Sequence, residues 1–204
     1  LPFPALTPVV HRASTILFPT LETFLARQEQ LYDGYSYGLY GHPASRHLAR
    51  HIAALEGGAR TLITPSGMAS ITVVNLAVLR SGDHVLLPDP IYAPARAAAD
   101  RFLSGIGVTA SYYDPTIASG IEQRLRPTTK LVWVESPASF TMEVQDLPAI
   151  VKAARHHGAL VAVDSTWASP LGFKALRHGA DFAVQALSKH VGGHSDLLLG
   201  SVTV

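Results

Sequence analysis

The hydrophobic positions of the chain fall into short continuous runs, separated by longer segments of mixed character. Runs of four to eight residues that are mostly apolar and do not alternate with polar residues are typical of strands buried on both faces of a sheet. Seven such runs are TLIT (61–64), HVLLP (84–88), VTASYY (108–113), KLVWVES (130–136), ALVAVDS (159–165), DFAVQAL (181–187) and LLLGSVTV (197–204). They predict seven strands.

The segments between most of these runs have the periodicity of helices. Helical spacing covers 68–80, 93–103 and 147–157, and it also covers 45–56, which ends at the helix stop Gly57-Gly58. Buried strands that alternate with helices indicate a sheet whose two faces are both covered. The pattern therefore predicts an α/β fold with a mostly parallel, seven-stranded sheet flanked by helices.

The two ends of the chain depart from this alternation. Residues 1–41 contain four prolines and then the aromatic turn YDGYSYGLYG, which together predict an extended arm with a short helix near 21–28. We therefore expect an N-terminal arm, residues 1–42, and a large domain, residues 43–204. A last run with no element after it would leave a hydrophobic edge uncovered, so we expect the chain to be a piece of a longer protein.

Composition narrows the class of protein. The chain is 48% hydrophobic and 15% charged, with a formal net charge of +1 and no long basic run, so nothing favours nucleic acid as a partner. The absence of cysteine excludes disulfides, thiolate metal sites and a cysteine nucleophile. The most apolar stretch, 63–79, carries polar residues and a proline, so it is a poor membrane span. We expect a soluble, cytoplasmic protein.

A metal site is not favoured. His47 and His51 have a spacing that suits two ligands on one helix, but no second pair completes a site, and a solvated helix face explains them better.

The residues just after each strand are the candidates for chemistry, because ligands of such sheets bind beyond the carboxyl ends of the strands. Ser66 and Gly67 follow the first run and open a helix, whose N-terminal N–H groups could bind a phosphate. A serine N-cap alone is the simpler interpretation. Tyr92 follows the second run and could pack in the core or stack on a flat ligand.

Two charged residues follow later strands. Asp164 ends a buried run, where an unpaired carboxylate is costly, so it needs a cation or the positive group of a ligand. Lys189 follows the next run, and a strand-end lysine with its ammonium group in water would explain it alone. Together with Gly67 and Tyr92, however, the two match the needs of pyridoxal phosphate: a phosphate site, a stacking ring, a carboxylate for the pyridinium nitrogen and a Schiff-base lysine.

Seven motifs, in order along the chain, carry a resemblance to a known family. They are YGLYGHP, ALEGG, PSGMAS, GDHVLLPDPIYAP, VESPASFTMEV, VDSTWASP and QALSKHVGGHSD. The chain resembles the Cys/Met-metabolism branch of the fold-type-I pyridoxal phosphate enzymes over nearly its whole length. Within that branch, ESPAS, TWA and GHSD are similar to the cystathionine β-lyases rather than to the γ-acting relatives.

The resemblance implies a role for eight residues. Lys189 would form the Schiff base and act as general base, and Asp164 would bind the pyridinium nitrogen. Tyr92 would stack on the ring, and Tyr37 or Tyr92 would assist proton movements. The phosphate would be held by Gly67, Met68 and Ser188, the phenolic oxygen would lie near Ser139, and Tyr37 would reach the active site of a neighbouring subunit.

The reaction and assembly that the resemblance implies follow from these roles. The expected reaction is β-elimination of cystathionine, or of a related sulfur amino acid, to a thiol, pyruvate and ammonia. A homo-oligomer of dimers with shared active sites, usually a tetramer, is expected.

Two positions depart from the pattern of the family. Leu39 stands where an arginine usually contacts the phosphate across the dimer, and Ser165 stands where asparagine usually follows the aspartate. The arginine that binds the substrate carboxylate is expected in a C-terminal small domain that this stretch does not contain. Two alternatives therefore stay open: a γ-elimination or γ-replacement enzyme of the same family, and a protein that binds the cofactor without turnover.

Overall fold

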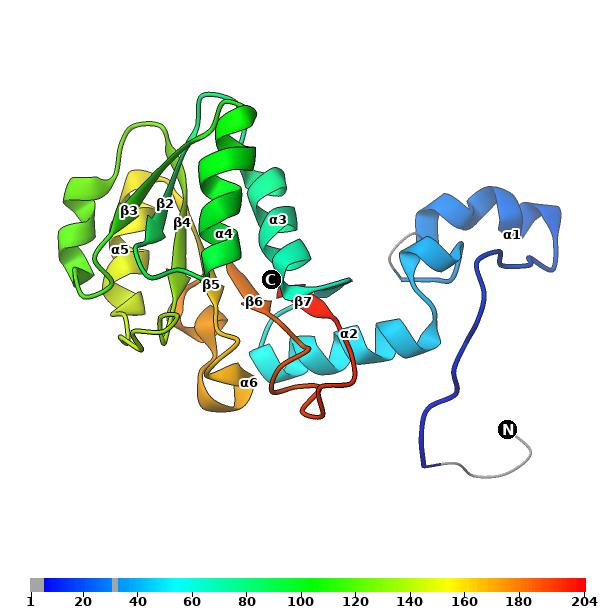
Figure 1. Ribbon diagram of the computed structural model, residues 1–204. Helices are drawn as coiled ribbons and strands as arrows, with labels where there is room; N and C mark the ends of the chain where they lie inside the picture. The colour runs from blue at the N-terminus through cyan, green and yellow to red at the C-terminus, as the bar shows by residue number, and fades with distance from the viewer. Residues whose placement is uncertain (1–5, 31–32) are drawn as a thin grey trace. The chain divides into compact units, whose positions relative to one another are not determined.

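The computed structural model describes residues 6–30 and 33–204, and its contacts form two compact units, Leu1–His51 and Ile52–Val204. The described part of the second unit contains one seven-stranded sheet in the order β1-β7-β6-β5-β4-β2-β3 (Figure 1). The strands are β1 Thr61–Thr64, β2 His84–Pro88, β3 Thr109–Tyr113, β4 Thr129–Glu135, β5 Leu160–Asp164, β6 Phe182–Gln185 and β7 Gly200–Thr203. Strands β2 to β6 pair in parallel, and β7 runs antiparallel to β1 and β6. The predicted fold class is confirmed.

Strand β6 ends earlier, and strand β7 begins later, than the apolar runs predict. Strand β6 stops at Gln185 because the next N–H group, that of Ala186, donates to Thr166 Oγ1 at 2.8 Å. Strand β7 starts at Gly200 because Leu199 exchanges hydrogen bonds with Ser188 and not with a neighbouring strand. Both departures occur where backbone groups bind side chains in place of the ladder.

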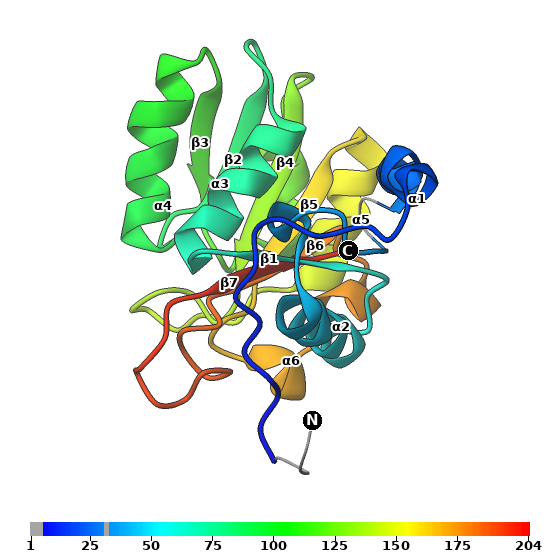
Figure 2. The ribbon, with the colours of Figure 1, turned by 90° about the vertical axis from the view of Figure 1, so that its right-hand side faces the viewer.

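Helices cover both faces of the sheet (Figures 1 and 2). The long helices are α3 Gly67–Val78, α4 Ala93–Ala97, which continues as the π-helical segment Ala98–Leu103, and α5 Leu147–His157. Shorter turns of helix are η4 Ala118–Arg124, α6 Ser169–Gly172 and η5 Ala175–His178. The α5 side and the α3–α4 side each enclose a separate hydrophobic cluster.

Strand β4 shows why the apolar runs are continuous. Val132 and Val134 belong to the cluster on the α5 side, whereas Leu131 and Trp133 belong to the cluster on the α3–α4 side. Successive side chains of a strand point to opposite faces, so a strand with a core on both faces needs an apolar residue at every position. Trp133 also satisfies its indole N–H, which donates to Asn75 Oδ1 at 2.8 Å.

The first unit is made of short elements. It contains α1 Leu21–Leu25, η1 Ala26–Gln30, η2 Gly38–Tyr40 and the beginning of α2 Pro43–Glu56. The short helix predicted near 21–28 is present, and Thr20 and Thr23 cap its amino end reciprocally. No residue of α1 or η1 is buried. The expected arm, residues 1–42, falls within this unit.

No helix in the described ranges 6–30 and 33–204 has both the length and the apolar character that a membrane crossing requires.

His84, at the start of β2, is fully buried and neutral. Its ring nitrogens lie 2.8 Å from Thr129 Oγ1 and 2.6 Å from Ser111 Oγ. Burial, with a smaller contribution from the charge of Arg126, lowers the pKa of His84 to about 4. The unfolded chain binds this proton near its ordinary pKa of about 6.5, so protonation favours unfolding as pH falls.

We therefore expect the free energy of unfolding to decrease between pH 6.5 and pH 4, by on the order of 2–3 kcal/mol from His84 alone. Denaturant titrations across this range, on the wild type and on His84→Gln, measure the contribution. The variant should show a shallower loss, whereas His156→Gln, at an exposed histidine, should follow the wild type. Equal slopes in all three proteins would contradict the expectation.

Candidate active site

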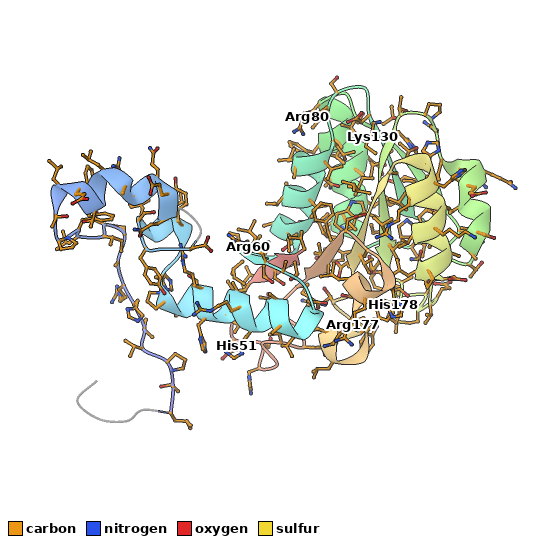
Figure 3. The ribbon with its side chains drawn as sticks, turned by 180° about the vertical axis from the view of Figure 1, so that it is seen from behind. His51, Arg60, Arg80, Lys130, Arg177 and His178 are labelled. Atoms are coloured by element: carbon orange, nitrogen blue, oxygen red, sulfur yellow. The ribbon has the colours of Figure 1, made fainter. Side chains whose placement is uncertain are left out.

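A cavity of about 560 Å³ lies beyond the carboxyl ends of β4, β5 and β6. The amino end of β4, marked by Lys130 in Figure 3, is the opposite end of the sheet. Seven of the eight predicted site residues line the cavity: Gly67, Met68, Tyr92, Ser139, Asp164, Ser188 and Lys189. Tyr37 belongs to the unit Leu1–His51, where its side chain is 47% exposed, and it is not part of this cavity.

The amino end of α3 forms one wall of the cavity. Ser66 is the N-cap and its hydroxyl accepts the N–H of Ala69 at 3.1 Å, so the predicted cap is present. Gly67 is required by packing, because a Cβ atom there would lie 2.6 Å from the Cβ of Ala186. The N–H groups of the first helical residues, Gly67 and Met68, have no partner inside the helix and can bind an anion.

Asp164 lies at the carboxyl end of β5. Its Oδ1 accepts the backbone N–H of Thr166 at 3.0 Å, and Thr166 Oγ1 in turn accepts the N–H of Ala186. Burial raises the pKa of the Asp164 carboxyl above its ordinary value, although the hydrogen bonds with Thr166 oppose this. Within the ranges 6–30 and 33–204, no basic side chain forms an ion pair with Asp164. The carboxylate therefore faces the cavity without a counter-charge from these residues.

Lys189 lies in the turn after β6, the strand next to β5, as the chain order predicts. Its backbone is fixed, since its N–H donates to Ala186 O at 3.0 Å and its carbonyl accepts from Gly193 N at 2.8 Å. Its side chain is exposed and borders the cavity. Ser188 holds this turn against Leu199, because its hydroxyl donates to Leu199 O at 3.1 Å and accepts from Leu199 N at 3.0 Å.

Tyr92 stands at the amino end of α4 with its side chain 44% exposed. Its backbone N–H donates to Glu135 Oε2 at 2.7 Å. Ser139 donates its hydroxyl hydrogen to the other oxygen of the same carboxylate, Glu135 Oε1. The hydroxyl proton of Ser139 is therefore engaged with Glu135 in this structure.

The residues that line the cavity without a role predicted from the sequence include Glu135, Trp167 and His190. Trp167 stacks on the ring of His190, with centroids 5.3 Å apart, and its indole N–H donates to Met142 Sδ at 3.0 Å. Glu135 had a usable signal, since it is a carboxylate at the end of an apolar strand, as Asp164 is. The stacked pair had none, because Trp167 and His190 follow different strands.

Comparison with known proteins shows which family and which relatives the chain resembles. The Cys/Met metabolism PLP-dependent enzyme family matches residues 2–204. The cystathionine beta-lyase of Escherichia coli is 39% identical over 200 residues, which is 97% of this chain and 51% of that protein. Cystathionine gamma-synthase 1 of Arabidopsis thaliana is 34% identical over 197 residues, which is 96% of this chain and 35% of that protein.

A crystal structure from Campylobacter jejuni that contains N'-pyridoxyl-lysine-5'-monophosphate superimposes with a TM-score of 0.91 at 26% identity, covering 98% of this chain and 49% of that one. The chain thus spans about half the length of the Escherichia coli and Campylobacter proteins and 35% of the length of the plant enzyme. The match of almost every residue to the family, together with the cavity at the strand ends, leads to one conclusion: the chain belongs to the Cys/Met metabolism PLP-dependent enzymes.

Proposed function

We propose that the protein containing this chain is a pyridoxal phosphate-dependent carbon–sulfur lyase that cleaves cystathionine, or a related sulfur amino acid, by β-elimination. One observation carries the proposal: the unpaired carboxylate of Asp164 and the amine-bearing Lys189 follow neighbouring strands and border the same cavity. A carboxylate and a lysine in this relation are what the cofactor of the family requires.

The residues around the cavity fit pyridoxal phosphate. Burial raises the pKa of the Asp164 carboxyl, and a positively charged pyridinium nitrogen beside it would stabilise its ionised form. The amino end of α3 offers free N–H groups for the phosphate. Tyr92 is 44% exposed, so its ring is available for stacking, and the exposed side chain of Lys189 borders the cavity with an amine of the kind that forms Schiff bases. The donor set therefore suits each part of the cofactor.

The reaction assigns a task to each of these side chains. When bound, pyridoxal phosphate supplies an electron sink for the electron pair released at the substrate Cα. Lys189 takes the Cα proton as general base, and Asp164 keeps a proton on the ring nitrogen by its negative charge. The bond between Cβ and sulfur would then break, the sulfur would leave as a thiolate that can take the proton held by Lys189, and water would convert the remaining three-carbon unit into pyruvate and ammonia. Tyr92 keeps the ring in place by stacking.

The γ-acting enzymes are the second candidate, because the relatives include a cystathionine gamma-synthase. Incubation of the intact protein with cystathionine and with cystine, followed by analysis of the keto acids, separates the two. Pyruvate supports β-elimination, whereas 2-oxobutyrate from cystathionine would assign the protein to the γ-acting group. Binding of the cofactor with no keto acid from any thioether or disulfide amino acid would favour a protein without turnover.

A homo-oligomer with shared active sites, of paired dimers, belongs to the same proposal. It gives Tyr37 and Leu39 of the first unit a role at a neighbouring subunit. The exposure of Leu39, which is 79%, and of other apolar side chains in the unit, such as Leu17 at 90%, supports it, since such side chains are commonly covered by a partner.

Leu39→Arg is expected to tighten retention of the cofactor by the oligomer by about 10- to 100-fold. Arginine forms charge-assisted, bidentate bonds with phosphate, and such bonds contribute roughly 1.5–3 kcal/mol. The measurement is the rate at which pyridoxal phosphate is lost during dialysis. Leu17→Arg adds the same charge elsewhere in the unit and should leave retention unchanged. If retention by Leu39→Arg is equal to or weaker than that of the wild type, another group already holds the phosphate.

A further inference from the structure

Glu135 is a buried carboxylate for which the proposed chemistry has no use. It is 9% exposed, lies at the carboxyl end of β4 and is the direct register partner of Asp164 on β5. Burial, with a smaller contribution from the charge of Asp164, raises the pKa of Glu135 to about 7, although its hydrogen bonds with Ser139 and Tyr92 oppose this. A carboxylate kept beside another in a cavity wall is costly, so its contacts are informative.

The contacts of the side chain lead to Tyr92. One oxygen accepts the Tyr92 backbone N–H at 2.7 Å and the other accepts the hydroxyl of Ser139. Tyr92 is the N-cap of α4, but its own side chain makes no capping bond. Glu135, at the end of β4, therefore caps α4 from outside the helix. A negative charge on its carboxylate also interacts favourably with the positive end of the helix dipole.

Glu135 is itself held in place from behind. Its carbonyl accepts the side-chain N–H of Gln145 at 2.7 Å, and Gln145 Oε1 accepts the hydroxyl of the buried Tyr113 at 2.6 Å. Gln145 and Tyr113 are 6% and 1% exposed. The carboxylate thus extends from a fixed strand end to the N-cap residue of α4, across the wall of the cavity.

We propose that Glu135 is a positioning residue that sets the place of the Tyr92 ring over the cofactor by fixing the amino end of α4. This inference rests on the proposed function, because it needs pyridoxal phosphate in the cavity. Ser139 is the secondary partner of the carboxylate, and the charged or titratable side chains that border the same space are Asp164, Lys189 and His190. None of these replaces the bond to the Tyr92 N–H group.

Glu135→Met tests the inference with a side chain of similar length. Methionine has no strong acceptor, so both hydrogen bonds are lost, whereas glutamine could keep both by accepting from Tyr92 and donating to the Ser139 hydroxyl. We expect the dissociation constant for pyridoxal phosphate to rise about tenfold, since a charge-assisted bond is lost. We also expect the visible circular dichroism of the bound cofactor to change, because that signal depends on how the ring is held. Titration of the cofactor-free intact protein, followed by tryptophan fluorescence, gives the constant.

Two further variants make the result specific. Glu122→Met makes the same change at an exposed position on η4 and should behave as the wild type in both measurements. Ser139→Ala removes the other partner but leaves the Tyr92 contact, so the dichroism should change less than in Glu135→Met. Unfolding curves of each cofactor-free variant show whether the fold is intact.

The outcomes separate two failures. If Glu135→Met binds pyridoxal phosphate with the affinity and dichroism of the wild type, or if Ser139→Ala perturbs both as much, the positioning role is wrong while the proposed function stands. If the wild-type protein itself does not bind pyridoxal phosphate, the proposed function fails first.

Discussion

Lys189→Ala is expected to abolish covalent attachment of pyridoxal phosphate and to reduce turnover by about 10³- to 10⁴-fold or more. General acid–base catalysis by a positioned side chain contributes roughly 10²–10⁴-fold, and the variant loses both the base and the covalent bond. Lys189 is the lysine that borders the cavity, in a turn whose backbone is hydrogen-bonded on both sides. Borohydride reduction of the wild type, followed by peptide mapping, should place the pyridoxyl group on this residue.

The chain provides a control for this prediction in Lys152, which is exposed on α5 and away from the cavity. Lys152→Ala should retain the adduct and the turnover of the wild type. A pyridoxyl group found on Lys174 or another lysine, or substantial turnover by Lys189→Ala, would overturn the assignment of the Schiff-base residue.

Asp164→Asn is expected to reduce turnover by roughly 10²- to 10³-fold without loss of the fold. The amide cannot keep the ring nitrogen protonated, and the loss of one preorganised electrostatic contact commonly costs this much in rate. The burial that raises the pKa of Asp164 also means that its charge disfavours the cofactor-free fold. The cofactor-free variant should therefore unfold at the same or a higher denaturant concentration than the wild type at neutral pH.

A loss of turnover together with unchanged or higher stability distinguishes a carboxylate that serves the reaction from one that serves the fold. Steady-state turnover of the intact protein and denaturant unfolding of its cofactor-free form are the two measurements. Asp114→Asn is the matched control, since Asp114 also follows a strand, β3, but lies outside the cavity. Near-normal turnover in Asp164→Asn, or a large loss of stability, would show that Asp164 serves the fold.

The candidate site was predictable because its residues obey a rule of position. In a parallel sheet the carboxyl ends of the strands meet at one edge, so the sequence predicts that Asp164 and the residues after β6 lie close together. Gly67 could be added because a serine before a helical segment marks an amino end, whereas Met68, Ser139 and Ser188 were named only by the resemblance to the family. The roles of these residues remain predictions that the substitutions above will test.

The sequence by itself determined the class of fold, since apolar runs without alternation require a sheet with a core on each face. It also determined most helix limits: α5 has the bounds that the periodicity predicts, 147–157. These features are local, because they follow from the periodicity and end signals of a single segment.

Only the tertiary structure decided which segments meet. It placed β7 between β1 and β6 in antiparallel pairing, and it brought the end of β4 to the start of α4, so that the Glu135 carboxylate caps Tyr92. It also engaged the hydroxyl of Ser188 with Leu199, eleven residues later in the chain. The hydrophobic periodicity of a segment does not predict such contacts. They depend on the order of the strands and on the distances between backbone groups in the packed sheet.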